Sequence, residues 1–391
     1  MKVLAIPDLH CHYDNYSRPG EDGTPSRLVD WRRTADALVK LAIRERVDLA
    51  VAPGDYFVTP RPPARAIIEV ANLFARLEAA GIPVVGCSGN HDTPGPGHPG
   101  PVDVIATLGQ RAWGITTPQV VEVAGIQVAV LPWAKPSAVA AESESTGDAI
   151  QQTAGVLLGI ARALAAQCDL SRPTIMIGHW AVAGCRTSSG QVLFGEEPTL
   201  PLAELQTLPF QAVIMGHIHR PQEWTSPGAP PVIHTGALER RDFGEEHDRR
   251  GAYIVDLDTR EVQWHDLPAR RFLTIDLANV TGGIRSEPTE WELDQVRDAI
   301  VRVCYRATEE QAKGIDHADI IETLYDSGAR HVAGVFPEII RGERGREASV
   351  TETTSPLEAL DKWLALRADL SEDLRTKARA EAEALLKEVS A

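Results

Sequence analysis

The sequence reads VVGCSGNHD from Val84 to Asp92, a short apolar run that closes in an amide, an imidazole and a carboxylate. Short apolar runs bounded by turn-forming residues are typical of buried strands. Four other places in the first 219 residues repeat this arrangement. In each, an apolar run leads into a motif: Asp8-Leu9-His10, Gly54-Asp55, Gly178-His179 and Gly216-His217-Ile218-His219. Strand after strand is therefore predicted to end in side chains that can bind metal.

Helical patterns separate the first three of these strands. Apolar residues recur at helix spacing over residues 31–42 and 67–77, and this spacing predicts two amphipathic helices. The alternation of strand and helix predicts an α/β sheet that collects ligands at the carboxyl ends of its strands. Further along, the β-like runs 231–235, 251–256 and 261–267 predict a second, more antiparallel sheet. The polar residues 14–30, rich in Gly, Pro and Asp, predict a loop.

The character of the sequence changes near residue 270. Segment 271–350 has short strand and helix patterns and none of the metal-binding motifs, which indicates a small α+β domain. Ser355 then begins a helix, with Pro at the first helical position and Glu358 closing a capping box. The interpretation is a domain of residues 1–270, a second domain of residues 271–350, and C-terminal helices in residues 351–391. The apolar stripe of these helices serves either packing within the chain or docking of a partner.

Composition bounds the class of protein. With 391 residues, of which 43% are hydrophobic and 24% charged, the chain is an ordinary globular sequence of two or three domains. Five scattered cysteines without a Cys-x-x-Cys pair favour reduced thiols and a cytoplasmic protein. No apolar run reaches the roughly 18 residues that span a bilayer, so no membrane partner is expected. The net charge of −16 has the wrong sign for binding nucleic acid, although bound metal ions invert the potential near a carboxylate cluster.

The side chains that end the strands form a ligand set large enough for two metal ions. Mixed carboxylate, amide and imidazole ligands suit Mn²⁺, iron or Zn²⁺ better than Ca²⁺. A carboxylate such as Asp55 can bridge two ions about 3.5–4 Å apart, which activate a water and hold the phosphate oxygens for in-line displacement. The predicted metal ligands are Asp8, His10, Asp55, Asn90, His179, His217 and His219.

His91 and Asp92 follow Asn90 and are assigned to catalysis rather than to metal binding. His91 can donate a proton to the leaving oxygen or stabilise developing charge. Asp92 can orient His91 through a hydrogen bond. Among the other histidines, His12 is the strongest extra candidate for contact with metal or substrate. His234 is the least certain of those interpreted as ordinary structural residues.

The ordered motifs resemble the calcineurin-like metallophosphoesterase superfamily over the first half of the chain. Within it, the stretches 216–222, 235–240 and 242–246 resemble the SbcD-type nuclease subunits of bacterial DNA repair complexes. This resemblance implies a four-layer α/β/β/α core, a small α+β capping domain and C-terminal helices. It implies a Mn²⁺-dependent DNA nuclease, a 3′-to-5′ exonuclease and a single-strand or hairpin endonuclease. The seven ligands would hold two Mn²⁺ ions, and His91 would be the catalytic histidine.

The resemblance also implies partners. Members of this group work on DNA as homodimers with an SbcC-type, SMC-like ATPase, which binds partly through the C-terminal helices. One position departs from the family pattern, because Val58 stands where some members place a second catalytic histidine. This departure puts in doubt any mechanism that needs two histidines around the scissile phosphate.

Two other hypotheses stay open. The acidic net charge favours a metallophosphoesterase that acts on a small-molecule or protein phosphate ester, because such a substrate needs no basic groove. The polar linker 342–354 and the apolar C-terminal helices favour a scaffold or DNA-end-binding subunit whose chemistry is dispensable.

Overall fold

The computed structural model describes nine segments of the chain. They are residues 1–12, 15–94, 98–107, 111–136, 146–188, 197–278, 285–340, 354–367 and 370–389. The chain divides into two compact units. Unit one contains Met1–Ile275, Pro288–Val303 and Ala318–Val335, and unit two contains Asp276–Glu287, Cys304–His317 and Phe336–Ala391. Every predicted metal ligand lies in unit one.

Two sheets form the centre of unit one. The first has five strands in the order β13-β12-β1-β2-β3, and the second has six in the order β10-β11-β9-β6-β5-β4. The strands of the first sheet are β1 (Lys2–Ala5), β2 (Leu49–Ala52), β3 (Val84–Gly86), β12 (Gly251–Asp256) and β13 (Val262–Asp266). Those of the second are β4 (Gln119–Val123), β5 (Ile126–Leu131), β6 (Thr174–Gly178), β9 (Ala212–Met215), β10 (Gln222–Trp224) and β11 (Val232–His234).

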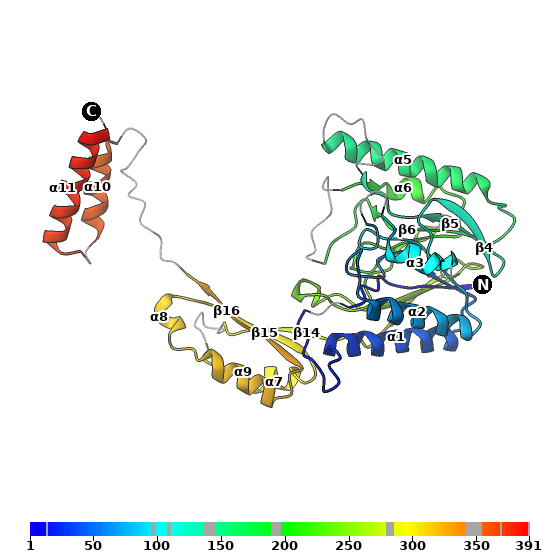
Figure 1. Cartoon of the computed structure of the whole chain (residues 1–391), viewed down its shortest axis with the longest axis horizontal. Coiled ribbons are helices and arrows are strands. Elements are labelled where there is room, and N and C mark those ends of the chain that lie inside the picture. The colour runs from blue at the N-terminus through cyan, green and yellow to red at the C-terminus, as the bar shows by residue number, and fades with distance from the viewer. Residues whose placement is uncertain are drawn as a thin grey trace. The chain divides into compact units, whose positions relative to one another are not determined.

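The sheets pack face to face between two layers of helices. Successive side chains of a strand point to opposite faces, so Leu4 packs among the side chains of α1 (Ser26–Arg44) and α2 (Ala64–Ala79), whereas Val3 packs against the second sheet. The outer face of the second sheet packs on α5 (Thr146–Gln167) and α6 (Leu202–Leu205). Figure 1 shows α1 and α2 on one side of the sheets and α5 and α6 on the other. The prediction of a four-layer α/β/β/α core is confirmed.

The prediction of a separate antiparallel sheet after residue 231 was wrong. Strand β11 pairs with β9 in the second sheet, and β12 pairs with β1 in the first. Alternate residues of β12 pack into the core beneath the helices and into the core between the sheets, as Ile254 and Val255 do. A strand that is buried on both faces belongs inside a sheet. The local pattern predicts the strand, whereas its partner depends on contacts across the whole fold.

The predicted loop 14–30 was too long, because α1 begins at Ser26. No side chain caps this helix; Pro25 precedes it without a cap hydrogen bond. Its first turns also carry buried polar residues, since Arg27 pairs with Asp30 at 3.0 Å. The start of this helix could not be predicted because it begins with polar residues and no side chain caps it.

Helix α5 is long and apolar enough, by length and composition alone, to cross a membrane. In this fold it covers a sheet, because Leu157, Ala161 and Leu164 are buried against residues of β5 and β6. Burial of a leucine side chain of this kind contributes about 2 kcal/mol to folding. The apolar side chains of α5 therefore pack in the core of unit one.

Short elements connect the central layers of unit one. They are α3 (Pro101–Thr107), the 3-10 helices η1 (Arg111–Trp113) and η2 (Phe243–Glu245), and the two-stranded sheet of β7 (Ala181–Val182) and β8 (Thr199–Leu200). Residues 95–97 and 137–145, which lie between elements of unit one, are outside the described part of the chain.

The chain after residue 270 forms a small sheet and then helices. The sheet has the order β14-β15-β16, and its strands contribute residues to both units. The elements are β14 (Phe272–Asp276), α7 (Glu290–Gln295), β15 (Ile300–Ala307), α8 (Glu309–Ala312), α9 (His317–Asp326), β16 (His331–Ile339), α10 (Pro356–Leu366) and α11 (Glu372–Val389). Ser355 and Glu358 form the predicted capping box of α10. The predicted domain boundaries at residues 270 and 350 stay predictions, and residues 342–353 of the predicted linker lie outside the described part of the chain.

Candidate metal centre

All of the predicted ligands follow the carboxyl ends of five central strands. Asp8 and His10 follow β1, Asp55 follows β2 and Asn90 follows β3, and these strands are neighbours in the first sheet. His179 follows β6, and His217 and His219 follow β9; these two strands are neighbours in the second sheet. Neighbouring parallel strands end at the same edge of a sheet, so the two packed sheets contribute ligands to one place.

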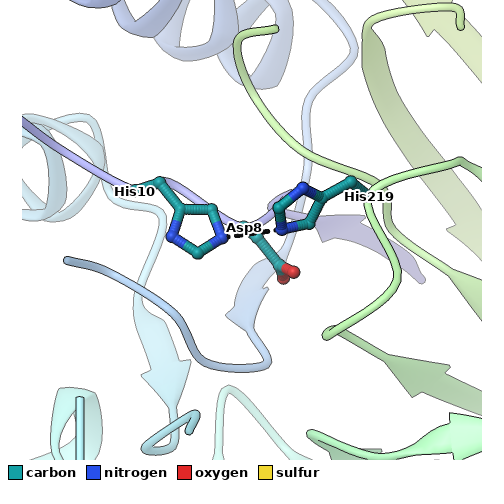
Figure 2. Close-up of side chains that lie close together, drawn as sticks. All are labelled: Asp8, His10 and His219. Carbon is teal, nitrogen blue, oxygen red and sulfur yellow. Dashed lines mark hydrogen bonds between the residues drawn. The ribbon is translucent and has the colours of Figure 1, made fainter. Parts of the chain in front are cut away.

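Asp8, His10 and His219 form the first group. The ligand atoms of these residues all lie within 4.8 Å of one another. The Nε2 atoms of His10 and His219 are 2.9 Å apart, although 209 positions separate the residues in sequence. Figure 2 shows both rings turned toward each other, with the carboxylate of Asp8 beside them.

The second group shares Asp8 with the first. Asp8, Asp55 and His179 again have ligand atoms within 4.8 Å of one another. Asn90 completes this group, because its Oδ1 lies 3.0 Å from Nε2 of His179 and 3.1 Å from Nδ1 of His217. The structure therefore brings all seven predicted ligands together in two adjoining groups.

Asp55 lies between the two groups. Its Oδ2 atom is 3.5 Å from Nε2 of His10 in the first group and 3.4 Å from Nε2 of His179 in the second. Its Oδ1 atom accepts a hydrogen bond of 2.9 Å from the backbone N–H of His91. A carboxylate in this position can bridge two ions.

Hydrogen-bond acceptors stand behind all four candidate histidine ligands. A carbonyl or carboxylate oxygen can only accept, so the ring nitrogen that faces it carries the proton and the other nitrogen of a neutral ring presents a lone pair. The pairs are His10 Nδ1 with Phe57 O at 3.2 Å, His179 Nδ1 with Pro53 O at 2.7 Å, His217 Nε2 with a Glu197 oxygen at 2.8 Å, and His219 Nδ1 with a Glu245 oxygen at 2.7 Å.

The lone pairs consequently converge on one another. In these tautomers the two Nε2 atoms of His10 and His219 both carry lone pairs, so neither can donate a hydrogen bond to the other. Among the described residues, the buried Oδ1 atom of Asp8 has no hydrogen-bond partner, and such an orphaned atom costs about 1–3 kcal/mol. A cation satisfies lone pairs that a proton does not, so this donor set fits divalent metal ions.

Burial and charge shift the pKa values of the group in opposite directions. Burial raises the pKa of Asp8 well above its ordinary value and lowers that of His10 well below. Burial also favours neutral Asp55, but the charges of His179 and His10 outweigh it and hold the pKa of Asp55 below its usual range. Burial opposes the charged form of His179, yet the carboxylate of Asp55 raises its pKa. Bound cations favour ionised carboxylates at such a site.

The glycines that precede the ligands permit close approach of the strand ends. A Cβ atom on Gly216 would lie 2.6 Å from Oδ1 of Asp8 and 2.7 Å from Nδ1 of His179. A Cβ atom on Gly89 would collide with the carboxylate of Asp55. These positions need glycine because any side chain would push the ligands apart.

Three predicted ligands have left-handed backbone conformations. The φ angles are 37° at His10, 52° at Asp55 and 86° at His217. Such values cost roughly 1–3 kcal/mol each for residues other than glycine and cluster at functional sites. The fold therefore tolerates strain where the strand ends turn their side chains into the centre.

His91 lies beside the first group, but its Nδ1 faces the backbone of Val58 and not the candidate ligands. Its Nδ1–H donates to the carbonyl of Val58 at 2.8 Å, and its ring centroid is 5.0 Å from that of His10. Its Nε2 has no hydrogen-bond partner among the described residues. His91 is thus held by one nitrogen beside the predicted ligands. Val58, at the position where the resemblance places a second histidine in some members, contributes its backbone carbonyl to that contact.

The structure assigns Asp92 a different contact from the predicted hydrogen bond with His91. The carboxylate of Asp92 accepts hydrogen bonds from the backbone N–H groups of Tyr56, Phe57 and Gly89, at 3.2, 3.1 and 3.0 Å. Burial and the charge of Asp55 raise the pKa of Asp92 to about 7. Asp92 therefore joins the loop after β2 to the loop after β3, and with them the segments that carry Asp55 and Asn90.

Sequence reasoning missed two carboxylates of this neighbourhood. Glu245 and Glu197 contact the outer nitrogens of His219 and His217. His234, interpreted from the sequence as a structural histidine, is fully buried; its Nδ1–H donates to the carbonyl of Gly216 at 3.1 Å, and its Nε2 accepts from a backbone N–H. Glu245 belongs to the stretch 242–246, which carried part of the family resemblance, whereas no local pattern points to Glu197. His12 is half-buried and belongs to neither ligand group.

A cavity of about 370 Å³ opens beside the two histidines of the β9 motif. It is lined by Thr187, Ser188, His217, Ile218, His219, Asp242, Gly244 and Glu245. The lining residues include hydroxyl groups, carboxylates and imidazoles, together with apolar atoms.

Comparison with known proteins agrees with this geometry. The family model for calcineurin-like phosphoesterase matches residues 1–221. The DNA double-strand break repair protein Mre11 of Aeropyrum pernix is 34% identical over 93 residues, 24% of this chain and 21% of that protein. Its namesake in Saccharolobus solfataricus is 31% identical over 94 residues, 24% of this chain and 23% of that protein. The chain thus spans less than a quarter of the length of these relatives.

Solved structures share much less sequence. A dimetal phosphatase from Danio rerio is 12% identical and has a TM-score of 0.42, over 68% of this chain and 96% of that one. A protein from Thermus thermophilus is 15% identical and has a TM-score of 0.41, over 68% of this chain and 98% of that one.

Proposed function

Because the chain belongs to the calcineurin-like phosphoesterase family, we propose that it hydrolyses phosphodiester bonds in DNA as the nuclease subunit of a DNA repair complex. One observation carries this proposal: five strand ends from two sheets gather two adjoining ligand groups around Asp55. The choice of DNA is supported by relatives that are named as double-strand break repair proteins. It is also supported by the SbcD-like stretches 216–222, 235–240 and 242–246.

The metal is proposed to be Mn²⁺, at two positions. Asp8, His10 and His219 would hold one ion, and Asn90, His179 and His217 would hold the other, with Asp55 between them. When bound, the pair supplies Lewis-acid activation of a water and of the phosphate. Oxygen and imidazole ligands are compatible with Mn²⁺.

His91 is proposed as the proton donor to the leaving oxygen. The carbonyl of Val58 holds its Nδ1–H, so Nε2 is the nitrogen that can exchange a proton with substrate. An imidazole nitrogen can both donate and accept a proton, which suits it to this task. Asp92 keeps the His91 segment in place through the backbone of Gly89 and of the loop after β2.

The expected partners follow from the same family resemblance. We propose a cytoplasmic homodimer that acts on DNA, as a 3′-to-5′ exonuclease and as an endonuclease on single strands and hairpins. Its proposed partner is an SMC-like ATPase of the SbcC type, docked in part on α10 and α11. In these helices Trp363, Leu366, Leu374 and Leu385 are 45–55% exposed, which supports docking of a partner rather than packing within the chain.

The test is Mn²⁺-dependent cleavage of end-labelled duplex and hairpin DNA, with and without the ATPase. We expect His91→Ala to lower the cleavage rate by about 10²–10⁴-fold without changing the metal content. His317→Ala, in unit two, is the matched control and should cleave as the wild type does. If the wild type cleaves neither substrate even with the ATPase present, the proposal of a DNA nuclease fails.

The acidic net charge of −16 favours a second candidate function, hydrolysis of a small-molecule or protein phosphate ester. The same preparation distinguishes the two. Turnover of cyclic nucleotides or of a phosphoprotein that exceeds turnover of DNA would favour this alternative. Faster turnover of DNA would exclude it.

A further inference from the structure

Glu245 contacts a candidate ligand on the side away from the metal positions. It ends η2, and its side chain is buried, with 5% of the residue exposed. One carboxylate oxygen lies 2.7 Å from Nδ1 of His219. The other accepts hydrogen bonds from the guanidinium of Arg250 at 2.5 Å and from the backbone N–H of Arg241 at 2.9 Å. Both oxygens are thus fixed by donors, so the carboxylate has a defined orientation.

Arg250 supplies the charge that allows a carboxylate to be buried here. It is 3% exposed and stands immediately before β12. A buried charge is tolerated when it is paired and hydrogen-bonded. The guanidinium also reaches the backbone carbonyl of His219 at 3.4 Å. Arg250 therefore contacts both Glu245 and the chain segment that carries His219.

The position of this pair matters because His219 comes from a different sheet than its partners. Asp8 and His10 follow β1, whereas His219 follows β9 of the second sheet. Strand β12, which follows Arg250, is hydrogen-bonded to β1. Glu245 and Arg250 thus connect His219 to the sheet that carries the other two residues of its group.

The acceptor behind His219, like the one behind His217, is a carboxylate. His10 and His179 face neutral backbone carbonyls. His219 faces a carboxylate, and the other oxygen of that carboxylate accepts hydrogen bonds from the guanidinium of Arg250 and the backbone N–H of Arg241, which favour the charged form. An ionised acceptor forms a stronger hydrogen bond than a carbonyl and makes the opposite nitrogen a better ligand.

We propose that Glu245, anchored by Arg250, is a positioning residue for metal binding. It fixes the Nδ1–H tautomer and the orientation of His219, so that Nε2 presents its lone pair to the ion shared with Asp8 and His10. The proposal rests on the metal centre of the proposed function. Nothing in it depends on whether the substrate is DNA.

The first experiment measures Mn²⁺ binding to the chelator-treated full chain by isothermal titration calorimetry. In Glu245→Gln, the single amide oxygen can accept either from His219 or from Arg250 and Arg241, so one of these two contacts is lost. We expect about 10–100-fold weaker binding of one of the two ions. The control is Glu246→Gln, a neighbour that contacts Thr274 instead, and its affinity should equal that of the wild type.

A second measurement does not depend on whether Glu245→Gln folds. Long-range ¹H–¹⁵N correlation spectra of the metal-free wild type report which nitrogen of each histidine carries the proton. The signal of His219 is assigned by its loss in His219→Gln. We expect the Nδ1–H form, and an Nε2–H form would overturn the proposal even if Glu245→Gln fails to fold.

The outcomes separate this inference from the function on which it rests. Wild-type affinity in Glu245→Gln would overturn the positioning role and leave the metal centre intact. Absence of Mn²⁺ binding by the wild type would overturn both. Weaker binding in Glu245→Gln alone, with unchanged Glu246→Gln and the Nδ1–H form of His219, would support the proposal.

Discussion

The metal centre and the C-terminal helix pair α10–α11 hold their structures in opposite ways. In the metal centre, buried contacts join residues that are far apart in sequence, as His10 and His219 are. In the helix pair, the contacts are local and exposed: a capping box begins α10, and Arg379 pairs with Asp361 at 2.7 Å. The difference shows that the reactive groups lie in the core and that the exposed apolar surface lies on the helices. The strained and precisely spaced groups belong to the layered core, whereas the helices keep large apolar side chains at their surface.

The largest expected effect comes from replacing Asp55, on which both ligand groups of the metal centre depend. Asp55→Asn removes the charge that both ligand groups share, so we expect loss of tight Mn²⁺ binding at both positions. Hydrolysis of phosphodiester bonds should slow by about 10³-fold or more, which corresponds to about 4 kcal/mol of barrier. Calorimetry and the cleavage assay measure the two effects. Asp258→Asn, an exposed carboxylate at the N-terminal amine, is the control. Two tight ions in Asp55→Asn would refute the bridging position.

A pair of glycines tests the contrast in packing. Gly216→Ala places a Cβ atom against Asp8 and His179, so we expect the free energy of unfolding to fall by about 1–3 kcal/mol. Gly159→Ala, on the exposed side of α5 with open space around it, should instead stabilise by about 0.4–1 kcal/mol. Urea unfolding in the presence of chelator measures both. Equal effects would mean that the strand ends are packed less tightly than the structure shows.

His234 makes the stability of the core depend on pH. Burial lowers its pKa to about 3, whereas a histidine of the unfolded chain titrates near pH 6.5. Acid therefore protonates the unfolded chain first, so the contribution of His234 is complete above about pH 6.5 and is lost as the pH falls toward 3. Between pH 7 and pH 5 we expect His234 to account for about 2 kcal/mol of lost stability.

The matched variant is His234→Gln, whose amide can replace both hydrogen bonds of the imidazole and does not titrate. Urea unfolding of both proteins with chelator, at pH 7 and at pH 5, isolates the contribution of His234. The same loss in wild type and variant would show that other groups cause the acid sensitivity.

The smallest expected effect concerns the helix pair. Ser355→Ala removes the N-cap of α10, which costs about 1 kcal/mol. Because the contacts of this region are local, the loss should stay local. Hydrogen exchange followed by mass spectrometry should show amides of residues 356–366 exchanging about fivefold faster. Exchange in β1 should not change, and a change there would mean that the two regions are coupled.

Much of the core could be predicted because its pattern is local. Apolar runs and the residues after them located the strands β1, β2, β3, β6 and β9 and the ligands at their ends, without any knowledge of distant contacts. The capping box at Ser355 was visible for the same reason. Candidate ligands and fold class therefore followed from short stretches of sequence.

What the sequence could not reveal depends on distant partners. The pairing of Lys2 with Asp256 joins β1 and β12 across most of unit one, and a strand pattern carries no record of its neighbour. Glu245 meets His219 across 26 positions, and Glu197 meets His217 across 20, at spacings that match no helix or strand period. Asp92 was expected to contact its neighbour His91, but the turn after β3 directs it toward the backbone of the loop after β2.

The supply of ligands by both sheets has a consequence for handling the protein. The sheets are held together by apolar packing, and each bound ion would cross-link them because its ligands come from both sheets. Removal of the ions would therefore do more than stop catalysis, because it would also remove these cross-links and let the two sheets separate more often. Preparations kept in chelator should be cleaved by proteases sooner than preparations kept in Mn²⁺. The lifetime of the enzyme in a cell would then follow the supply of its metal.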